Sequence, residues 1–122
     1  MQFKYLVRTV FNLRLMYLIS IRWDTTPYGI VILSNNNHHI MFANRTFRKR
    51  MGMSLRKLRR HPIIDFLHKD DIEKTICTLA RMQTGSSVSG FKNRCVDVNG
   101  KSISMKWDID RNREVYWGRC YF

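Results

Sequence analysis

The chain reads G-F-K-N-R-C-V-D-V-N-G-K-S-I-S-M-K-W from Gly90 to Trp107, and this stretch decides the fold. Two runs rich in β-branched residues flank the dipeptide Asn99-Gly100. Asn-Gly between such runs is the strongest short-range signal for a β-hairpin, because a type I′ turn needs a positive φ at both central residues. The register that a two-residue loop predicts pairs Val98 with Lys101, Val96 with Ile103, and Arg94 with Met105.

This register gives the hairpin one apolar face, because side chains alternate along a strand. The residues expected on that face are Val96, Val98, Ile103, Met105, Trp107 and Ile109. Arg94 is expected there too, and a buried guanidinium needs an acceptor. We expect a structural partner, a carboxylate such as that of Asp65 or Asp108. A bound anion, or a side chain that reaches solvent at the sheet edge, is the alternative.

Short apolar runs at Ile30 to Leu33 and at His39 to Ala43, joined by an Asn-rich turn, predict a second hairpin. Between residues 44 and 67, breaks at Gly52, Ser54 and Pro62 keep any helix short. A last strand is expected over residues 114 to 122.

Residues 70 to 83 predict the one longer helix. Asp70 or Asp71 is suited to cap it, and Gly85 follows as a stop. Its expected apolar stripe consists of Ile72, Ile76, Leu79 and Ala80. The predicted fold is α+β, a five-stranded antiparallel sheet with short helices and one longer helix on one face.

The order of these motifs resembles that of PAS domains over residues 24 to 122. The residues that carry the resemblance are Pro27-Tyr28-Gly29-Ile30 at the first strand, Asn44 after the second, Phe47 and Met51-Gly52 in the next helix, Ser54 to Leu58, Phe66 to Asp71 with Lys69 where Pro is common, and the hairpin with Phe91, Asn93-Arg94, Asn99-Gly100 and Trp107. We therefore expect an N-terminal amphipathic flanking helix over residues 1–23 and a PAS-like domain over residues 24–122.

The resemblance implies a sensory and protein-interaction module in signal transduction. Such a module binds a small molecule between the sheet and the long helix or serves as a dimerisation unit, and it can act on an effector such as a kinase. The candidate ligand-pocket residues are Ile32, Phe47, Phe66, Ile76, Leu79, Arg94, Met105 and Trp107. Ordinary core packing is the alternative role for each of them.

The same resemblance bears on cofactors. Photosensory flavin members carry a Cys within an Asn-Cys-Arg-Phe motif, whereas this chain has Met51 to Arg56 near the corresponding place. Haem members carry an axial His in the long helix, and residues 70 to 83 contain no His. We therefore expect neither a covalent flavin adduct nor haem. A non-covalent flavin, a small metabolite and an empty apolar core remain open.

The first 23 residues are apolar with helical spacing over a broad arc, and a helix that is apolar nearly all round must bury two faces. We expect one face on the sheet and the other on a second copy, giving a homodimer. The candidate dimerisation residues are Phe3, Leu6, Val10, Leu13 and Tyr17. No transmembrane segment is expected, because the charge-free run from Leu15 to Ile21 is far shorter than the ~20 residues of a membrane span. An acid-free, Arg-containing N-terminus also resembles a transit peptide.

Positive charge is concentrated in the first half of the chain. Residues 1–60 hold twelve Lys or Arg and one acid, Asp24, and eight of those basic residues lie between Arg45 and Arg60. Such a cluster suits nucleic acid, anionic lipid or an acidic protein, or is only a solvated face. The alternative function is therefore a basic nucleic-acid-binding regulatory protein. We do not expect it, because Phe47 is the only aromatic residue among these charges.

Chemistry-bearing motifs are absent from the sequence. Cys77, Cys95 and Cys120 form no Cys-x-x-Cys pair, and the four histidines have no ligand spacing, so no metal site is expected. Reduced, mostly buried thiols suit a cytoplasmic protein. No phosphate-binding loop, nucleophile elbow or pair of catalytic carboxylates occurs, and we expect no enzyme activity.

Overall fold

The structure, a computed structural model, describes residues 23–122. Its strands are β1 (Gly29–Ser34), β2 (Ile40–Ala43), β3 (Ser87–Val96), β4 (Ser102–Arg111) and β5 (Val115–Tyr121). Its helices are α3 (Arg45–Met51), α4 (Leu55–Leu58), the 3₁₀ turns η1 (Ile63–Phe66) and η2 (Lys69–Asp71), and α5 (Ile72–Arg81). The predicted flanking helix and the candidate dimerisation residues Phe3 to Tyr17 lie outside the described residues.

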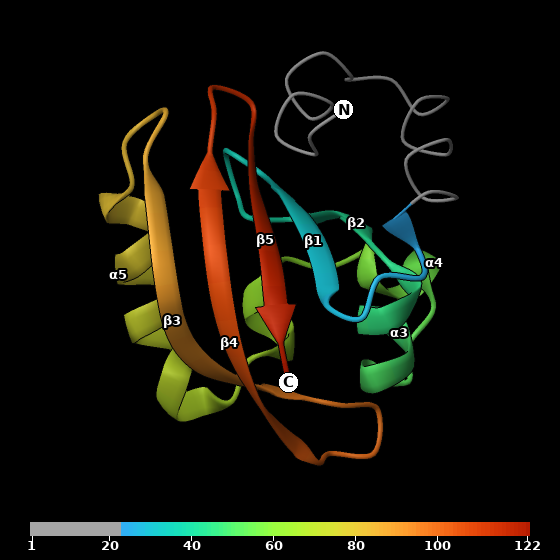
Figure 1. Ribbon diagram of the computed structural model, residues 1–122. Helices are drawn as coiled ribbons and strands as arrows, with labels where there is room; N and C mark the ends of the chain where they lie inside the picture. Colours follow the sequence, from blue (N-terminus) through green and yellow to red (C-terminus); the bar gives the residue numbers. More distant parts are fainter. Residues whose placement is uncertain (1–22) are drawn as a thin grey trace.

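The five strands form one antiparallel sheet in the order β2-β1-β5-β4-β3. The helices lie on one face of it, with α3 and α4 near β1 and β2, and α5 behind β3 (Figure 1). The predicted α+β architecture is confirmed. No helix among residues 23–122 is long and apolar enough to cross a membrane.

The hairpin at Asn99-Gly100 forms, but the predicted register is wrong by one residue on β3. Cys95 pairs with Ile103, Arg94 with Ser104, and Asn93 with Met105. The loop has three residues, because the backbone N–H of Asp97 donates to Lys101 O at 2.9 Å. Gly100 alone takes the left-handed conformation, at φ 79°. This is a type I turn followed by a glycine bulge.

The side chain of Asp97 explains the longer loop. Its Oδ1 accepts hydrogen bonds from the N–H groups of Asn99 and Lys101, at 2.9 and 2.8 Å. An Asp that bonds to the backbone two residues on favours such a turn. The N–H of Val98 also donates to Met51 O at 2.9 Å, which fixes the loop against the end of α3. Val96 and Val98 therefore leave the apolar face, and Val98 is 48% exposed.

The inner face of the sheet and the helices enclose the larger of two apolar clusters. The β4 residues predicted for this face are buried there: Ile103, Met105, Trp107 and Ile109. On β3 their neighbours are Cys95, Asn93 and Phe91 in place of the two valines. The outer face of β1, β2 and β5 carries a second cluster of Ile30, Ile32, Phe42, Val115 and Trp117.

Asn44 joins the start of the described chain to α3. Its Oδ1 accepts from Ile30 N and Phe47 N, which caps the helix. Its Nδ2 lies 3.0 Å from the carbonyl oxygen of Trp23 and 3.1 Å from that of Tyr28. Asp24 Oδ1 accepts from Arg45 N at 2.8 Å. The segment before β1 is thus held at the N-terminal end of α3.

Candidate functional site

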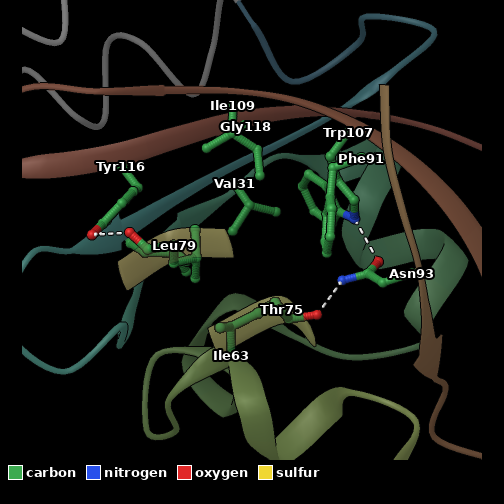
Figure 2. Close-up of a pocket in the computed structure, with 11 residues that line it drawn as sticks. Val31, Ile63, Thr75, Leu79, Phe91, Asn93, Trp107, Ile109, Tyr116 and Gly118 are labelled. Atoms are coloured by element: carbon green, nitrogen blue, oxygen red, sulfur yellow. Dashed lines mark hydrogen bonds between the residues drawn. The ribbon is translucent and has the colours of Figure 1, made fainter. Parts of the chain in front are cut away.

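A small cavity lies between the inner face of the sheet and α5 (Figure 2). Its volume is about 40 Å³, and its walls include Val31, Leu79, Phe91, Trp107, Ile109 and Tyr116. A buried water needs about 10–15 Å³, so the cavity has room for two or three water molecules or a fragment of that size. Pockets for drug-sized ligands reach about 300–1,000 Å³, so a flavin or a haem would require its side chains to move.

Gly118 makes part of this arrangement possible. It lies on β5 against the face of Trp107, and a Cβ at position 118 would come within 2.8 Å of the Trp107 ring. Any side chain at this position would therefore push the indole into the cavity or force the strands apart.

A chain of buried hydrogen bonds crosses one end of the cavity. Trp107 Nε1 donates to Asn93 Oδ1 at 2.8 Å, and Asn93 Nδ2 donates to Thr75 Oγ1 at 3.2 Å (Figure 2). The Thr75 hydroxyl donates in turn to Asp71 O at 2.7 Å. The chain runs from β4 through β3 to the first turn of α5, so the position of the helix is coupled to the two strands.

The other end of α5 is also held by side chains of the sheet. Tyr116 Oη donates to Leu79 O at 2.9 Å (Figure 2), and the Arg111 guanidinium donates to Met82 O. The same guanidinium lies 5.0 Å from the centre of the Tyr116 ring. The His38 ring meets that ring edge-on at 5.3 Å, and burial, followed by the charge of Arg111, lowers the pKa of His38.

Asp71 and Arg94 form an ion pair where α5 begins. Arg94 Nε donates to Asp71 Oδ2 at 2.9 Å, Arg94 Nη2 donates to Asp71 Oδ1 at 3.0 Å, and the Arg94 backbone N–H adds a third bond of 2.7 Å. The hydrogen bonds from the Arg94 side chain lower the pKa of the Asp71 carboxyl to about 2, against the opposing effect of its burial. This bidentate pair fixes the start of α5 to the edge strand β3.

Arg94 pairs with a carboxylate, as predicted, but the partner is Asp71 and neither Asp65 nor Asp108. Asp65 instead pairs with His61, at 2.9 Å, and Asp108 accepts hydrogen bonds from Ser89 and Gly90. The register shift is the reason, because it places Arg94 opposite Ser104 at the sheet edge rather than opposite Met105.

The expected helix cap also differs. The Asp71 side chain makes no capping hydrogen bond, because Arg94 occupies it. Instead, His68 Nδ1 accepts from Asp70 N at 3.1 Å and stabilises the turn before α5.

The predicted pocket residues divide by position. Leu79 and Trp107 line the cavity, whereas Phe47, Phe66 and Met105 are buried in the surrounding core. Ile32 and Arg94 do not line the cavity: Ile32 lies on the outer face of the sheet, and Arg94 lies at its edge.

The helical stripe is rotated from the predicted one. Thr75 and Leu79 face the sheet, while Ile76 is 37% exposed and Ala80 is exposed. The helix contributes a threonine to the cavity where an isoleucine was expected, so the stripe drawn from hydrophobic residues alone was misplaced.

Two polar residues that line the cavity were missed by the sequence reasoning, Asn93 and Thr75. Both are polar and buried, at 5% and 4% exposure. Hydrophobic pattern alone cannot indicate such residues. The correct register would have placed Asn93 opposite Met105, on the apolar face beside an indole N–H that needs an acceptor.

Of the three thiols, two are buried and one is exposed. Burial raises the pKa of Cys95 to about 12, and it also raises that of Cys120. Both thiols are therefore protonated and unreactive near neutral pH. Cys77 is exposed on α5. Within residues 23–122, no group of three or more His, Cys, Asp or Glu side chains could hold a metal ion.

The chain is thus a small α+β domain with a cavity between its sheet and a helix. The chain adopts the PAS fold within that class, as solved structures show. It superposes on a PAS domain of an HTR-like protein from Haloarcula marismortui with a TM-score of 0.75, 14% identity and coverage of 88% of this chain and 96% of that one. A domain of a sensor histidine kinase/response regulator from Geobacter sulfurreducens gives a TM-score of 0.73, 14% identity and coverage of 91% and 97%.

The Rhodobacter sphaeroides LOV protein is similar at a TM-score of 0.73 and 9% identity, over 91% of this chain and 68% of that one. No protein-family model and no curated protein matches the chain.

Proposed function

We propose that this chain is a sensory and protein-interaction module of signal transduction that binds a small ligand between the sheet and α5. The observation that carries the proposal is the cavity between sheet and helix with the buried Thr75–Asn93–Trp107 hydrogen-bond chain at its end. Domains of similar fold belong to sensor histidine kinases. The proposal assigns no catalysis to the chain and places it in the cytoplasm, where it acts as a homodimer on an effector protein.

The cavity favours a small and mostly apolar ligand with one hydrogen-bonding group. Apolar side chains make up most of its wall, and Asn93 and Thr75 supply its polar atoms. The Asn93 oxygen has a second lone pair and its nitrogen a second N–H, so it can bond to a ligand as donor or acceptor. Neither a covalent flavin nor haem is part of the proposal.

A ligand in this position would act on α5. A molecule too large for the cavity must displace side chains of its wall, such as Leu79 or Phe91, and a polar group near Asn93 competes for its bond to Thr75. Both changes alter how the first turns of α5 sit on β3. Occupancy of the cavity is thereby converted into a displacement of a surface helix, which a partner can detect.

The test is to fill the cavity without changing its chemistry. Val31→Ile adds one methylene on the inner face, whereas the control Val115→Ile adds the same group to the buried outer face. Native mass spectrometry and an absorbance spectrum of freshly purified protein report any bound molecule. We expect a bound small molecule in the wild type, lower occupancy in Val31→Ile, and wild-type occupancy in Val115→Ile.

Thermal unfolding of the ligand-free variants gives a second measurement. Val31→Ile should be at least as stable as the wild type because it fills empty space. Val115→Ile should be less stable by about 1–3 kcal/mol because that side of the sheet is already packed. A wild type that carries no molecule, together with no melting shift from any compound of a small-metabolite panel, would reject ligand binding.

A further inference from the structure

Seven exposed basic side chains lie on and beside the two short helices α3 and α4. This basic face consists of Arg45, Lys49, Arg50, Arg56, Lys57, Arg59 and Arg60. The ion pairs of the described residues involve none of them. The eighth basic residue of this stretch, Arg48, is different, because it pairs with Asp24 at 3.3 Å. No carboxylate of the described residues therefore pairs with the basic face, and its one internal charge contact is that of the Arg50 guanidinium, 4.9 Å from the centre of the Phe122 ring.

The arrangement of the charges costs local stability. Arg45 and Lys49 stand four residues apart on α3, and Arg56 of α4 has the same spacing to Arg60, which lies just beyond the end of that helix at Leu58. Like charges at this spacing repel and destabilise a helix. The need for solubility does not explain this concentration of one charge. In residues 61–122, ten basic residues are accompanied by eight acidic ones. An external anionic surface would relieve the repulsion.

The composition of residues 1–22, which precede this face in the sequence, indicates what class of anionic partner the face binds. Residues 1–22 contain Lys4, Arg8, Arg14 and Arg22, no acidic residue, and a large share of apolar side chains. The chain enters the domain at Trp23 and Asp24, which Asn44 and Arg45 hold at the start of α3. An apolar and basic sequence thus begins next to the basic face. This combination is typical of segments that lie in the interface of an anionic membrane.

Nucleic acid fits the same face less well. At 1.5 Å per residue, the seven residues of α3 span about 10 Å and the four of α4 about 6 Å. Readout of a major groove depends on several side chains presented along a helix or a β-ribbon. The one aromatic residue of these helices, Phe47, is fully buried and cannot stack on bases.

We propose that the basic face docks this domain peripherally on an anionic phospholipid surface. The face supplies the charge attraction, and the four basic residues of the sequence before it, Lys4, Arg8, Arg14 and Arg22, add to that charge. Each Lys or Arg near an anionic leaflet strengthens binding roughly fivefold. The cavity lies between the sheet and α5, and none of the seven residues of the basic face lines it.

The experiment is co-sedimentation of the full chain with lipid vesicles in about 0.15 M salt. One set of vesicles is pure phosphatidylcholine, and the other is equal parts phosphatidylcholine and phosphatidylglycerol. The face variant reverses four charges: Lys49→Glu, Arg56→Glu, Lys57→Glu and Arg60→Glu. The matched control reverses four exposed charges elsewhere: Lys69→Glu, Arg81→Glu, Lys92→Glu and Arg113→Glu. Circular dichroism checks that both variants are folded.

We expect the wild type to bind the anionic vesicles and not the neutral ones. The face variant should bind at least about 100-fold more weakly than the wild type, and the control variant should lose much less although its net charge is the same. Equal losses in the two variants would overturn the proposal, since net charge alone would explain them. Absence of binding to anionic vesicles would overturn it as well.

A competition experiment separates lipid from nucleic acid. Duplex DNA is added to the sedimentation assay at the same concentration of negative charge as the phosphatidylglycerol. Retention of the protein on the vesicles supports the membrane assignment. Transfer of the protein to the DNA would overturn it in favour of a nucleic-acid partner. If the face variant proves unfolded, the neutral set Lys49→Gln, Arg56→Gln, Lys57→Gln and Arg60→Gln replaces it.

Discussion

Asn93 is the residue on which the polar part of the cavity depends. Its amide oxygen accepts from the Trp107 indole, and its amide nitrogen donates to Thr75. Both partners are buried, so neither can turn to bulk water if the amide is removed. A group left without a partner costs about 1–3 kcal/mol.

We therefore expect Asn93→Ala to lower the free energy of unfolding by at least that amount, as measured by urea denaturation. Thr75→Val removes the hydroxyl that accepts from Asn93, with little change in shape, and it is a second probe of the same network. The amide network would be unimportant if both variants unfolded at the urea midpoint of the wild type.

Trp107 combines two roles at the same site, since its ring fills the core and its N–H bonds to Asn93. Trp107→Ala should cost about 3–5 kcal/mol, the range usual for large-to-small core substitutions. Denaturant midpoints of ligand-free protein measure this. Trp107→Phe keeps most of the ring but loses the N–H, and it separates packing from hydrogen bonding. An alanine variant as stable as the wild type would mean that the ring lines a ligand space and does not support the core.

At the scale of elements, α5 is attached to β3 by one ion pair at its start. The pKa of Asp71 is about 2 in the folded protein, below its ordinary value of 3.8. A carboxyl with a lowered folded pKa stabilises the fold above its unfolded pKa, and this contribution is lost as pH falls through the folded pKa. The stabilisation from Asp71 is therefore present above pH 3.8 and disappears between about pH 4 and pH 2.

We expect Asp71→Asn to be less stable than the wild type at pH 7, with the difference shrinking as pH falls from 4 to 2. Urea midpoints at several pH values measure it. The control is Asp70→Asn, since the side chain of Asp70 is 64% exposed and makes only a long contact to His68. A constant difference across this pH range would show that the Asp71 charge does not hold the helix.

The β3–β4 loop is the element whose geometry a single side chain decides. Asp97 accepts two backbone hydrogen bonds in this loop. Asp97→Ala should lower the free energy of unfolding by about 1 kcal/mol, the usual contribution of such a bond. The same substitution favours the two-residue type I′ loop, so amide exchange of Val96 and Val98 should rise. Unchanged exchange and stability would assign the register to the Val98–Met51 contact.

These elements also mark how far sequence reasoning reaches. Hydrophobic runs and breaks identified the strands, the short helices and the longer helix, because burial and turn chemistry are local. The predicted strand register was wrong because the hydrogen bonds of Asp97 favour a three-residue loop over the two-residue loop that Asn-Gly predicts. The predicted apolar stripe on α5 was misplaced because Thr75 is buried against the sheet while Ile76 is exposed. Trp107 and Leu79 were predicted as pocket residues and line the cavity. The polar residues Asn93 and Thr75 could not be predicted without the three-dimensional strand pairing.

At the scale of the whole molecule, we predict a homodimer through residues 1–22. Sedimentation velocity at micromolar concentration should give a dimer for the full chain. Leu6→Glu with Val10→Glu should give a monomer, because two charges on the predicted apolar surface oppose its burial. The control, Ile76→Glu with Val98→Glu, places the same charges on apolar residues that are already exposed, and it should remain a dimer. A monomeric wild type would refute the prediction.

The contact between Gly118 and Trp107 also limits how the two positions can change during evolution. A Cβ at position 118 would meet the indole at 2.8 Å, so a side chain at 118 and a tryptophan at 107 coexist only if the structure shifts. An alanine at 118 is therefore accepted most easily in a lineage in which residue 107 is already smaller than tryptophan. Among descendants of a common ancestor, this order of events should leave a correlated pair of columns, and that pair offers a way to recognise distant kin whose overall identity has decayed.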